Sequence, residues 1–277
     1  MAAARTKSSA PKGSGNVVAQ ARGKQAPKRT GSSLWENVKS IAGAVAIYLV
    51  IRTLLVEAFR IPSGSMIPSL LVGDWLFVNK LIYGPEIPFT EVRLPGYREP
   101  RRGDVAVFKS PPQIDQPEDP TPTLVKRIVG MPGDTLYMRR GLLYVNGLPQ
   151  RQGFAAAANP VGDPDETSPL FAWQQRIALQ GTRFGDAPAR PTHDHWGPLR
   201  IPAGFYFMMG DNRYCSKDSR YWGIVPRGNM KGRPLIVYYS YTPGGPPDPS
   251  GCSGDTSDRP LSFLTDIRWG RLGHLIR

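Results

Sequence analysis

Short runs of β-branched and aromatic residues, broken by turn signals, fill the chain from about residue 70 to 148 and return after residue 203. The runs cover residues 75–78, 105–108, 124–129, 135–138, 142–145, 204–209 and 235–241. Between several of them lie combinations that favour tight turns, namely Arg102-Gly103-Asp104, Met131-Pro132-Gly133-Asp134 and Asn146-Gly147. This pattern predicts a mainly β protein that is rich in turns.

Composition favours the same fold class. Glycine and proline number 30 and 29 among 277 residues, which is well above their usual share and disfavours a helix bundle. The only cysteines are Cys215 and Cys252, so a disulfide scaffold and a four-thiolate zinc site are excluded. At most one disulfide can form, and the sequence leaves open whether it does.

The N-terminal region is strongly basic. Residues 1–40 hold eight lysines and arginines against one acid, Glu36, in a chain whose net charge is +13. Residues 1–34 are rich in Ala, Gly, Ser and Pro, which predicts a disordered tail. Such a tail fits three roles: a solvated segment without a partner, a nucleic-acid-binding arm, or the cytoplasmic flank of a membrane segment.

One apolar segment, Ile41–Phe59, follows the tail. Its uncharged core between Lys39 and Arg52 is only twelve residues, a length that alone fits a buried helix or the core of a signal peptide. Extension across Arg52, whose side chain can reach the interface, gives about the 20 residues that a membrane helix needs. No small-residue cleavage pattern follows, so we expect an uncleaved transmembrane anchor over residues 35–59. The basic tail then lies in the cytoplasm and the rest of the chain outside.

The remaining chain divides by composition. We expect one β domain from residues 60–148 and 201–277, interrupted at residues 149–200 by a Pro-, Ala- and Asp-rich insertion or small subdomain.

A serine-containing turn directly follows the expected anchor, in Ile61-Pro62-Ser63-Gly64-Ser65-Met66-Ile67-Pro68. Two prolines fix the backbone on either side of Gly64, which permits a close backbone approach. A serine in such a turn is well placed to act as a nucleophile beside an oxyanion site. The competing interpretation is an ordinary Ser/Gly/Pro linker, and a reactive serine also needs a base.

Histidine is a poor candidate for that base. His193 and His195 flank Asp194 in the Pro-rich segment, and His274 lies near the end of the chain. The His-x-His pair has no third ligand beside it, so it does not predict a zinc site. The G-x-S-x-G motif of α/β-hydrolases is also absent, which leaves a Ser-His-Asp triad poorly supported.

Lysine is the alternative base. In the strand predicted at residues 124–129, alternation places Lys126 on one face between Leu124 and Ile128. Burial there disfavours the ammonium form and can lower the pKa of the lysine by several units, so that its amine accepts a proton. The competing interpretation is a lysine whose stem crosses the strand while its head reaches water.

A third polar stretch, residues 210–223, alternates acids, bases and hydroxyls. It is not a calcium loop, because Arg213 stands where an oxygen ligand is needed and the turn glycine is absent. The pattern suits either a hydrogen-bonded shell that supports a site or an exposed polar loop.

Together and in this order, the three stretches after a single anchor resemble bacterial signal peptidase I, the membrane-bound Ser-Lys peptidase that removes signal peptides from exported proteins. The family's nucleophile box, Pro-Ser-Gly-Ser-Met-x-Pro-Thr-Leu, is matched at residues 62–70 with Ser69 in place of Thr. The further boxes are matched at residues 73–78, 102–108, 126–134 and 210–223. The resemblance implies a Ser-Lys peptidase-type antiparallel β-sheet domain with an N-terminal transmembrane helix.

The same resemblance assigns roles residue by residue. It implies that Ser65 is the nucleophile, Lys126 the general base, Ser63 a donor to the oxyanion hole beside the Ser65 N–H, and Ser216 the hydroxyl that orients the lysine amine. Supporting ion pairs are implied for Arg127 with Asp211 and for Asp218 with Arg220. The residues implied to border the substrate are Phe59, Ile61, Met66, Leu124 and Val125. One departure stands out, because Tyr214-Cys215 occupies positions where the family usually carries Asp-Asn.

The implied function is cleavage of signal-peptide-bearing pre-proteins after a small-x-small site such as Ala-x-Ala, at the outer face of the cytoplasmic (inner) membrane. The implied partners are these pre-proteins and the lipid bilayer; neither a metal, nor a cofactor, nor nucleic acid is expected. Two other classes remain as alternatives. One is a membrane-tethered binding protein whose tail contacts nucleic acid or anionic lipid. The other is a repressor-type Ser-Lys autoprotease, which would need a helix-turn-helix that residues 1–33 cannot build.

Overall fold

The computed structural model describes residues 34–87, 90, 92–151, 165–244 and 261–276. The chain forms two compact units, residues 1–44 and residues 45–277. The tail expected at residues 1–34 lies outside the described residues except for Leu34, as does Cys252.

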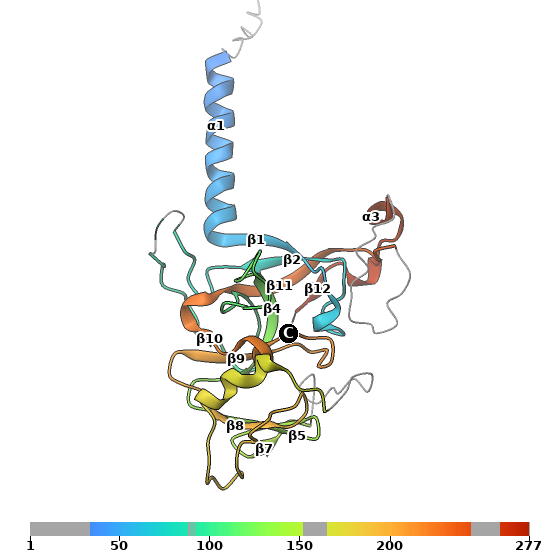
Figure 1. Ribbon diagram of the computed structural model, residues 1–277. Coiled ribbons are helices and arrows are strands. Elements are labelled where there is room, and N and C mark those ends of the chain that lie inside the picture. The colour runs from blue at the N-terminus through green and yellow to red at the C-terminus, as the bar shows by residue number, and fades with distance from the viewer. Residues whose placement is uncertain (1–33, 88–89, 91, 152–164, 245–260, 277) are drawn as a thin grey trace, which may run out of the picture. The chain divides into compact units, whose positions relative to one another are not determined.

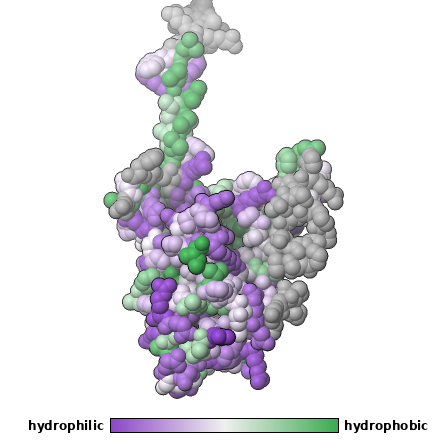
Figure 2. All heavy atoms as spheres, in the orientation of Figure 1, coloured by the Kyte–Doolittle hydropathy of each residue, from purple (hydrophilic) through white to green (hydrophobic). Residues whose placement is uncertain are grey.

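The described chain begins in helix α1 (Leu34–Val50), which continues into a short π-helical segment, η1 (Ile51–Leu55). No residue of α1 is buried, and Figure 2 shows mainly apolar residues along much of its surface. Among the helices that the structure describes, none combines the length and the apolar character needed to traverse a bilayer. The helical part ends at Leu55, whereas the anchor was expected to continue to residue 59. The next residues, 56–60, form a strand instead.

The larger sheet has eight strands in the order β1-β2-β11-β3-β4-β9-β10, with β12 paired to β11, and all of its pairings are antiparallel. Its strands are β1 (Val56–Arg60), β2 (Asp74–Asn79), β3 (Val105–Lys109), β4 (Thr123–Gly130), β9 (Phe205–Met209), β10 (Val225–Pro226), β11 (Met230–Ser240) and β12 (His274–Leu275). Five of these, β2, β3, β4, β9 and β11, overlap most of a predicted run, and the mainly β, antiparallel fold is confirmed.

A second, four-stranded sheet has the order β7-β6-β5-β8. Its strands are β7 (Leu148–Pro149), β6 (Leu142–Val145), β5 (Thr135–Arg139) and β8 (Trp196–Arg200). Within the second unit, β1 and β2 lie at one end and β5, β7 and β8 at the other (Figure 1). The turn between β6 and β7 uses left-handed backbone at Asn146 and Gly147, as their dipeptide predicts.

Part of the segment expected as an insertion is built into this fold. Residues 152–164 lie outside the described residues, but β8 pairs with β5, placing Leu136 opposite Leu199. The segment also carries a 3₁₀ helix, η4 (Pro169–Arg176), which packs against the short helix α2 (Ser219–Trp222). The segment therefore contributes to both the second sheet and the region around α2.

Three apolar clusters form the core of the second unit. One lies under β3, β4 and β9 and includes Phe108, Ile128 and Met208. The second fills the space beside the smaller sheet and includes Leu136 and Trp196. The third surrounds the turn after β1 and consists of Ile61, Met66, Leu70, Leu76, Val105, Val237 and Ile276, with Val125 packed against it. The serine turn is thus fixed on a packed base rather than on a free linker.

Asp74 ties the end of the chain to this turn region. Its fully buried carboxylate accepts hydrogen bonds from Arg271 (2.6 and 3.0 Å) and from Ser240 Oγ (2.7 Å), and Arg268 lies 3.4 Å away. It also accepts from the Leu71 backbone N–H at 2.8 Å. These contacts join β2, β11 and the C-terminal segment through one side chain.

We predict that Asp74→Ala lowers the free energy of unfolding by about 3 kcal/mol, because removing one member of a buried ionic cluster leaves its partners uncompensated. Chemical denaturation followed by circular dichroism measures the change. The control is Asp119→Ala at an exposed position, which is expected to change stability by less than about 0.5 kcal/mol. Equal stability of the two variants would contradict the structural role of Asp74.

Candidate active site

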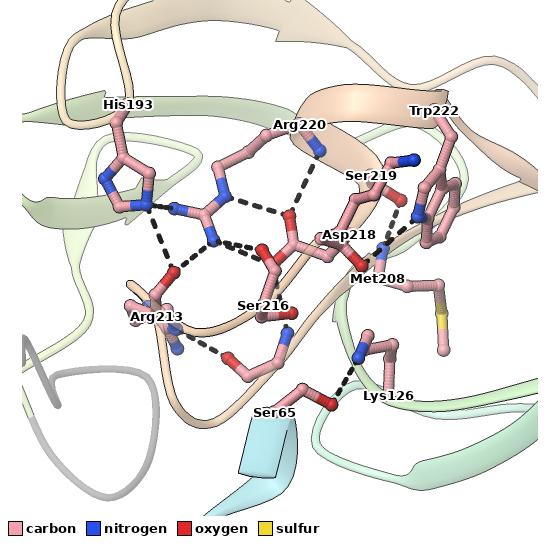
Figure 3. Close-up of polar contacts among 12 residues, drawn as sticks. Ser65, Lys126, His193, Met208, Arg213, Ser216, Asp218, Ser219, Arg220 and Trp222 are labelled. Carbon is pink, nitrogen blue, oxygen red and sulfur yellow. Dashed lines mark hydrogen bonds and ion pairs between the residues drawn. The ribbon is translucent and has the colours of Figure 1, made fainter. Parts of the chain in front are cut away.

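The hydroxyl of Ser65 and the amine of Lys126 are in direct contact. Lys126 Nζ lies 2.6 Å from Ser65 Oγ in a hydrogen bond that joins residues 61 positions apart (Figure 3). Both side chains are buried, with 7% of Ser65 and 4% of Lys126 exposed. A proton can pass between two heavy atoms at this distance without rearrangement of either chain.

The Ser65 turn is fixed from the opposite loop. Residues Gly64–Met66 form a single 3₁₀ turn, η2, directly after β1. The backbone N–H of Asn212 donates to the Ser65 carbonyl at 3.1 Å, and Asn212 Nδ2 donates to the Gly64 carbonyl at 3.2 Å. Asn212 thereby fixes the position of the Ser65 backbone.

Gly210 allows this close approach. A Cβ at position 210 would lie 2.5 Å from the Ser65 carbonyl oxygen and 2.2 Å from Ser216 Oγ. Both distances are far inside van der Waals contact, so only glycine lets the loop after β9 pass this close to the serine turn.

Lys126 is held in an apolar setting by strand alternation. Leu124 and Ile128, its neighbours on the same face of β4, both belong to the cluster that also holds Phe108 and Met208. Burial is the main cause that lowers the pKa of Lys126, from its ordinary 10.5 to about 8. The charge of Arg220 lowers it further, whereas Asp218 and Asp211 raise it. A substantial fraction of the amine is therefore neutral under mildly basic conditions.

Two ion pairs flank the Ser65–Lys126 contact. Arg127 binds Asp211 through two hydrogen bonds of 2.7 Å, and Ser69 Oγ donates to the same carboxylate at 2.5 Å. Arg220 binds the fully buried Asp218 through two bonds of 2.8 Å. Asp218 also accepts from the Gly210 backbone N–H at 3.1 Å, which fixes the loop that faces Ser65.

The two remaining hydroxyls differ in environment. Ser63 is exposed, and its Oγ lies 3.4 Å from Ser65 Oγ. Ser216 Oγ is buried and has no hydrogen-bond partner among the described residues. The contact expected between Ser216 and the lysine amine is therefore absent from the hydrogen bonds that the structure forms in this part of the chain.

The residues implied to border the substrate fall into two groups. Leu124 and Val125 are half-buried on β4, and Phe59 is half-buried on β1. Ile61 and Met66 are buried in the cluster around the serine turn, with 4% and 1% of their surfaces exposed. The latter two therefore offer little surface for contact with a substrate.

The polar stretch after β9 also makes contacts that the sequence did not predict. Tyr214 Oη donates to Asp194 at 2.5 Å, and its ring stacks on His193 with centroids 4.5 Å apart. Cys215 is disulfide-bonded, and the only other cysteine in the chain, Cys252, lies outside the described residues. Asn212 was missed as well, although its place beside Asp211 in the last matched box was a usable signal.

Metal chemistry has no site in the described part of the chain. No group of three or more His, Cys, Asp or Glu side chains there is arranged to hold an ion. His193 of the His-x-His pair contacts Asp194 and Arg220 instead (Nδ1 to Asp194 Oδ1 2.7 Å, Nε2 to Arg220 2.5 Å).

A serine hydroxyl against a buried lysine amine, on an antiparallel β framework, is the geometry of a serine hydrolase in which lysine takes the place of histidine. The model of the family described as "Signal peptidase, peptidase S26" matches residues 34–239. The chain belongs to this family of serine peptidases.

Named relatives agree. The chain is 38% identical to a signal peptidase I of Pseudomonas aeruginosa over 228 residues, which cover 78% of this chain and 74% of that protein. It is 31% identical to a signal peptidase I of Leptolyngbya laminosa over 75% of this chain and 81% of that protein. A crystal structure of a signal peptidase I from Enterococcus faecalis shares 26% identity and covers 49% of this chain and 97% of its own, with a TM-score of 0.30.

We predict that Lys126→Met stabilises the fold at neutral pH. The folded-state pKa near 8 lies below the unfolded value of 10.5, so the unfolded chain binds more protons in that range. Lys126 therefore costs up to about 3 kcal/mol of stability below pH 8, and this cost vanishes as the pH rises towards 10.5.

Denaturation of the variant and the wild type at several pH values measures the difference. Lys109→Met, at an exposed position of the neighbouring strand β3, is the control and should show no pH-dependent gain. A Lys126→Met protein that is no more stable than the wild type at pH 7 would show that the lysine is not desolvated.

Proposed function

We propose that this signal peptidase cleaves its substrates by acyl transfer through Ser65 and Lys126. Neutral Lys126 takes the proton of Ser65, and Ser65 Oγ attacks the scissile carbonyl to form an acyl-enzyme. The resulting ammonium protonates the leaving amine, and water then hydrolyses the ester with the amine again acting as the base. The 2.6 Å contact between the two side chains is the observation that carries this proposal.

Stabilisation of the oxyanion falls to Ser63 and Ser65. Ser63 Oγ lies beside the nucleophilic oxygen at 3.4 Å and is exposed, so it can donate to a substrate carbonyl held at Ser65. The Ser65 backbone N–H, fixed in the 3₁₀ turn, is the second donor that we assign. Ser216 is proposed to orient the amine once substrate is bound, since its buried hydroxyl is otherwise unpaired.

The two ion pairs act as supports in this proposal. Arg127–Asp211 links the strand of the base to the Ser69 end of the nucleophile turn. Asp218–Arg220 fixes the loop that carries Gly210 and Ser216. Both pairs keep the distance between Ser65 Oγ and Lys126 Nζ constant, and neither contacts the substrate.

The substrate is proposed to bind as an added strand along β4. Strand β3 pairs with β4 from Thr123 to Arg127, whereas β9 pairs with β4 only from Arg127 onward. Among the described residues, no strand pairs with the second edge of Thr123–Lys126. A peptide at this edge would gain main-chain hydrogen bonds beside Leu124 and Val125 and would reach Ser65.

Small residues at alternate substrate positions follow from this placement. Alternate side chains of an added strand point to the same face, so two of them meet the enzyme together. Ile61 and Met66 are tightly packed, and half-buried Phe59 lies on the strand that leads into the turn. Shallow pockets of this kind fit cleavage after a small-x-small sequence in a pre-protein.

Membrane attachment is proposed through the N-terminal segment at residues 35–59. Its helix exposes a series of large apolar side chains, among them Ile41, Val45, Ile47, Leu49 and Val50. The basic segment before it places the N-terminus in the cytoplasm and the catalytic β domain, residues 60–148 and 201–277, on the other side. Residues 149–200 are proposed to support that domain.

The expected result is that wild-type protein cuts a purified pre-protein after its signal peptide, whereas Ser65→Ala and Lys126→Met leave it intact. N-terminal sequencing of the product identifies the bond that is cut. Lys109→Met should cut as fast as the wild type. Processing by either the Ser65 or the Lys126 variant would refute the assignment.

Activity should rise with pH through the pKa of Lys126. The amine acts as a base only when it is neutral. In a plot of log(kcat/KM) against pH, we therefore expect a slope of one at low pH and a plateau above about pH 8. At pH 7 the rate should be about tenfold below the plateau. A pH-independent rate between pH 6 and 9, in protein that stays folded, is the outcome that this mechanism does not allow.

A further inference from the structure

His193 lies in the segment between the two parts of the catalytic domain, yet its ring is part of the shell around the site. It is buried, with 1% of its surface exposed. Its Nε2 atom lies 2.5 Å from Nη1 of Arg220 (Figure 3). Its Nδ1 atom lies 2.7 Å from Oδ1 of Asp194.

The partners of the ring determine where its proton sits. Nε2 also lies 3.1 Å from the carbonyl oxygen of Arg213, which can only accept and already receives a hydrogen bond from Nη2 of Arg220. A guanidinium nitrogen can only donate, and Nη1 of Arg220 is the nearer neighbour at 2.5 Å, so we assign Nε2 of His193 as the acceptor that carries no proton. The single ring proton is then on Nδ1 and is donated to Asp194. Tyr214 supports this arrangement, because its hydroxyl donates to the other oxygen of Asp194 and its ring stacks on the imidazole.

Arg220 carries the effect towards the reacting groups. Its Nε and Nη2 atoms bind Asp218, and Nη2 also donates to the carbonyls of Arg213 (2.6 Å) and Ser216 (3.2 Å). Among the described residues, only His193 forms a hydrogen bond with Nη1. Without that acceptor, a buried guanidinium would leave an N–H unpaired, which is costly enough to move it.

The balance of charge around Lys126 depends on the same arginine. Asp218 and Asp211 favour the ammonium form of Lys126, and Arg220 opposes it. Arg127 neutralises Asp211, and Arg213 is a further buried cation in this region. A guanidinium that withdraws from Asp218 would leave that carboxylate less compensated and would favour protonation of the amine.

We propose that His193 is a positioning residue of the catalytic site, whose unprotonated Nε2 holds Arg220 on Asp218 and thereby keeps the Lys126 amine neutral and the Ser216 loop in place. The inference rests on the proposed function of Ser65 and Lys126. It also gives a role to Tyr214, which departs from the family pattern: Tyr214 and Asp194 fix the tautomer of His193.

The test compares His193→Phe, His193→Gln and wild type in cleavage of a pre-protein from pH 5.5 to 9.5. Phe keeps the stack on Tyr214 but offers no acceptor, whereas Gln offers a carbonyl oxygen. For the Phe variant we expect the midpoint of the acid limb to rise by about half a pH unit or more, kcat at pH 7 to fall at least about threefold as a result, and KM to stay within about twofold. Gln should restore part of both changes, and the exposed His195→Phe should match the wild type.

Several results would overturn the proposal. A Phe variant that melts earlier but keeps the wild-type midpoint and kcat would show a structural role alone, and a Gln variant no better than Phe would exclude the acceptor. If the wild type itself fails to cleave while it is folded, the proposed function is wrong, and this inference falls with it. A wild type that cleaves beside an unchanged Phe variant defeats the inference only.

A measurement on the wild type keeps the proposal testable if the Phe variant does not fold. The chain has three histidines, so ¹⁵N spectra of the imidazole rings can be assigned by comparison with His193→Gln. We expect His193 with a protonated Nδ1 and an unprotonated Nε2 at neutral pH. The opposite tautomer, or a charged ring, would overturn the proposal.

Discussion

Desolvation of one amine governs the site. Lys126 lies on a strand between two aliphatic residues of a packed cluster, and this burial lowers its pKa to about 8. An ammonium group has a lower free energy at the surface than in this buried position. The fold is therefore less stable for having a buried lysine that can act as a base without histidine or metal. The same burial requires a partner for the amine, and Ser65 Oγ at 2.6 Å is that partner. The burial of Lys126 is therefore the cause both of its contact with Ser65 and of the loss of stability.

Much of the surrounding structure keeps that contact at a fixed length. Arg127–Asp211 and Asp218–Arg220 are buried, bidentate pairs near it, and Asn212 fixes the serine turn through two backbone carbonyls. Such pairs add little net stability, because desolvation offsets most of their attraction. The ion pairs contribute to position instead, because each fixes a loop whose backbone faces Ser65 or Lys126. Rigid supports of this kind allow a proton transfer without prior rearrangement.

Local patterns predicted the strands well and the joining of distant segments poorly. The run 124–129 lies in β4, as its β-branched and aliphatic residues predict, and the face on which Lys126 lies follows from the period of two. Residues 56–59 were expected in the membrane helix, because their apolar character continues that of α1, but pairing with β2 makes them part of strand β1. Ser65 and Lys126 are 61 positions apart, so no local pattern could join them; only the resemblance of the boxes did. The role of His193 had no such signal, because His193 lies outside the matched boxes, whereas its partner Arg220 lies in the last of them.

A titration of the Lys126 amine itself shows most directly whether burial keeps this group neutral. NMR of protein carrying ¹³C at the lysine ε-carbon, with the resonance assigned by its loss in Lys126→Met, follows the protonation state through the chemical shift. We predict a midpoint of about 8, more than two units below that of ordinary lysine. A midpoint near 10.5 would show that the amine is solvated and protonated at neutral pH, and the proposed mechanism would then have no base.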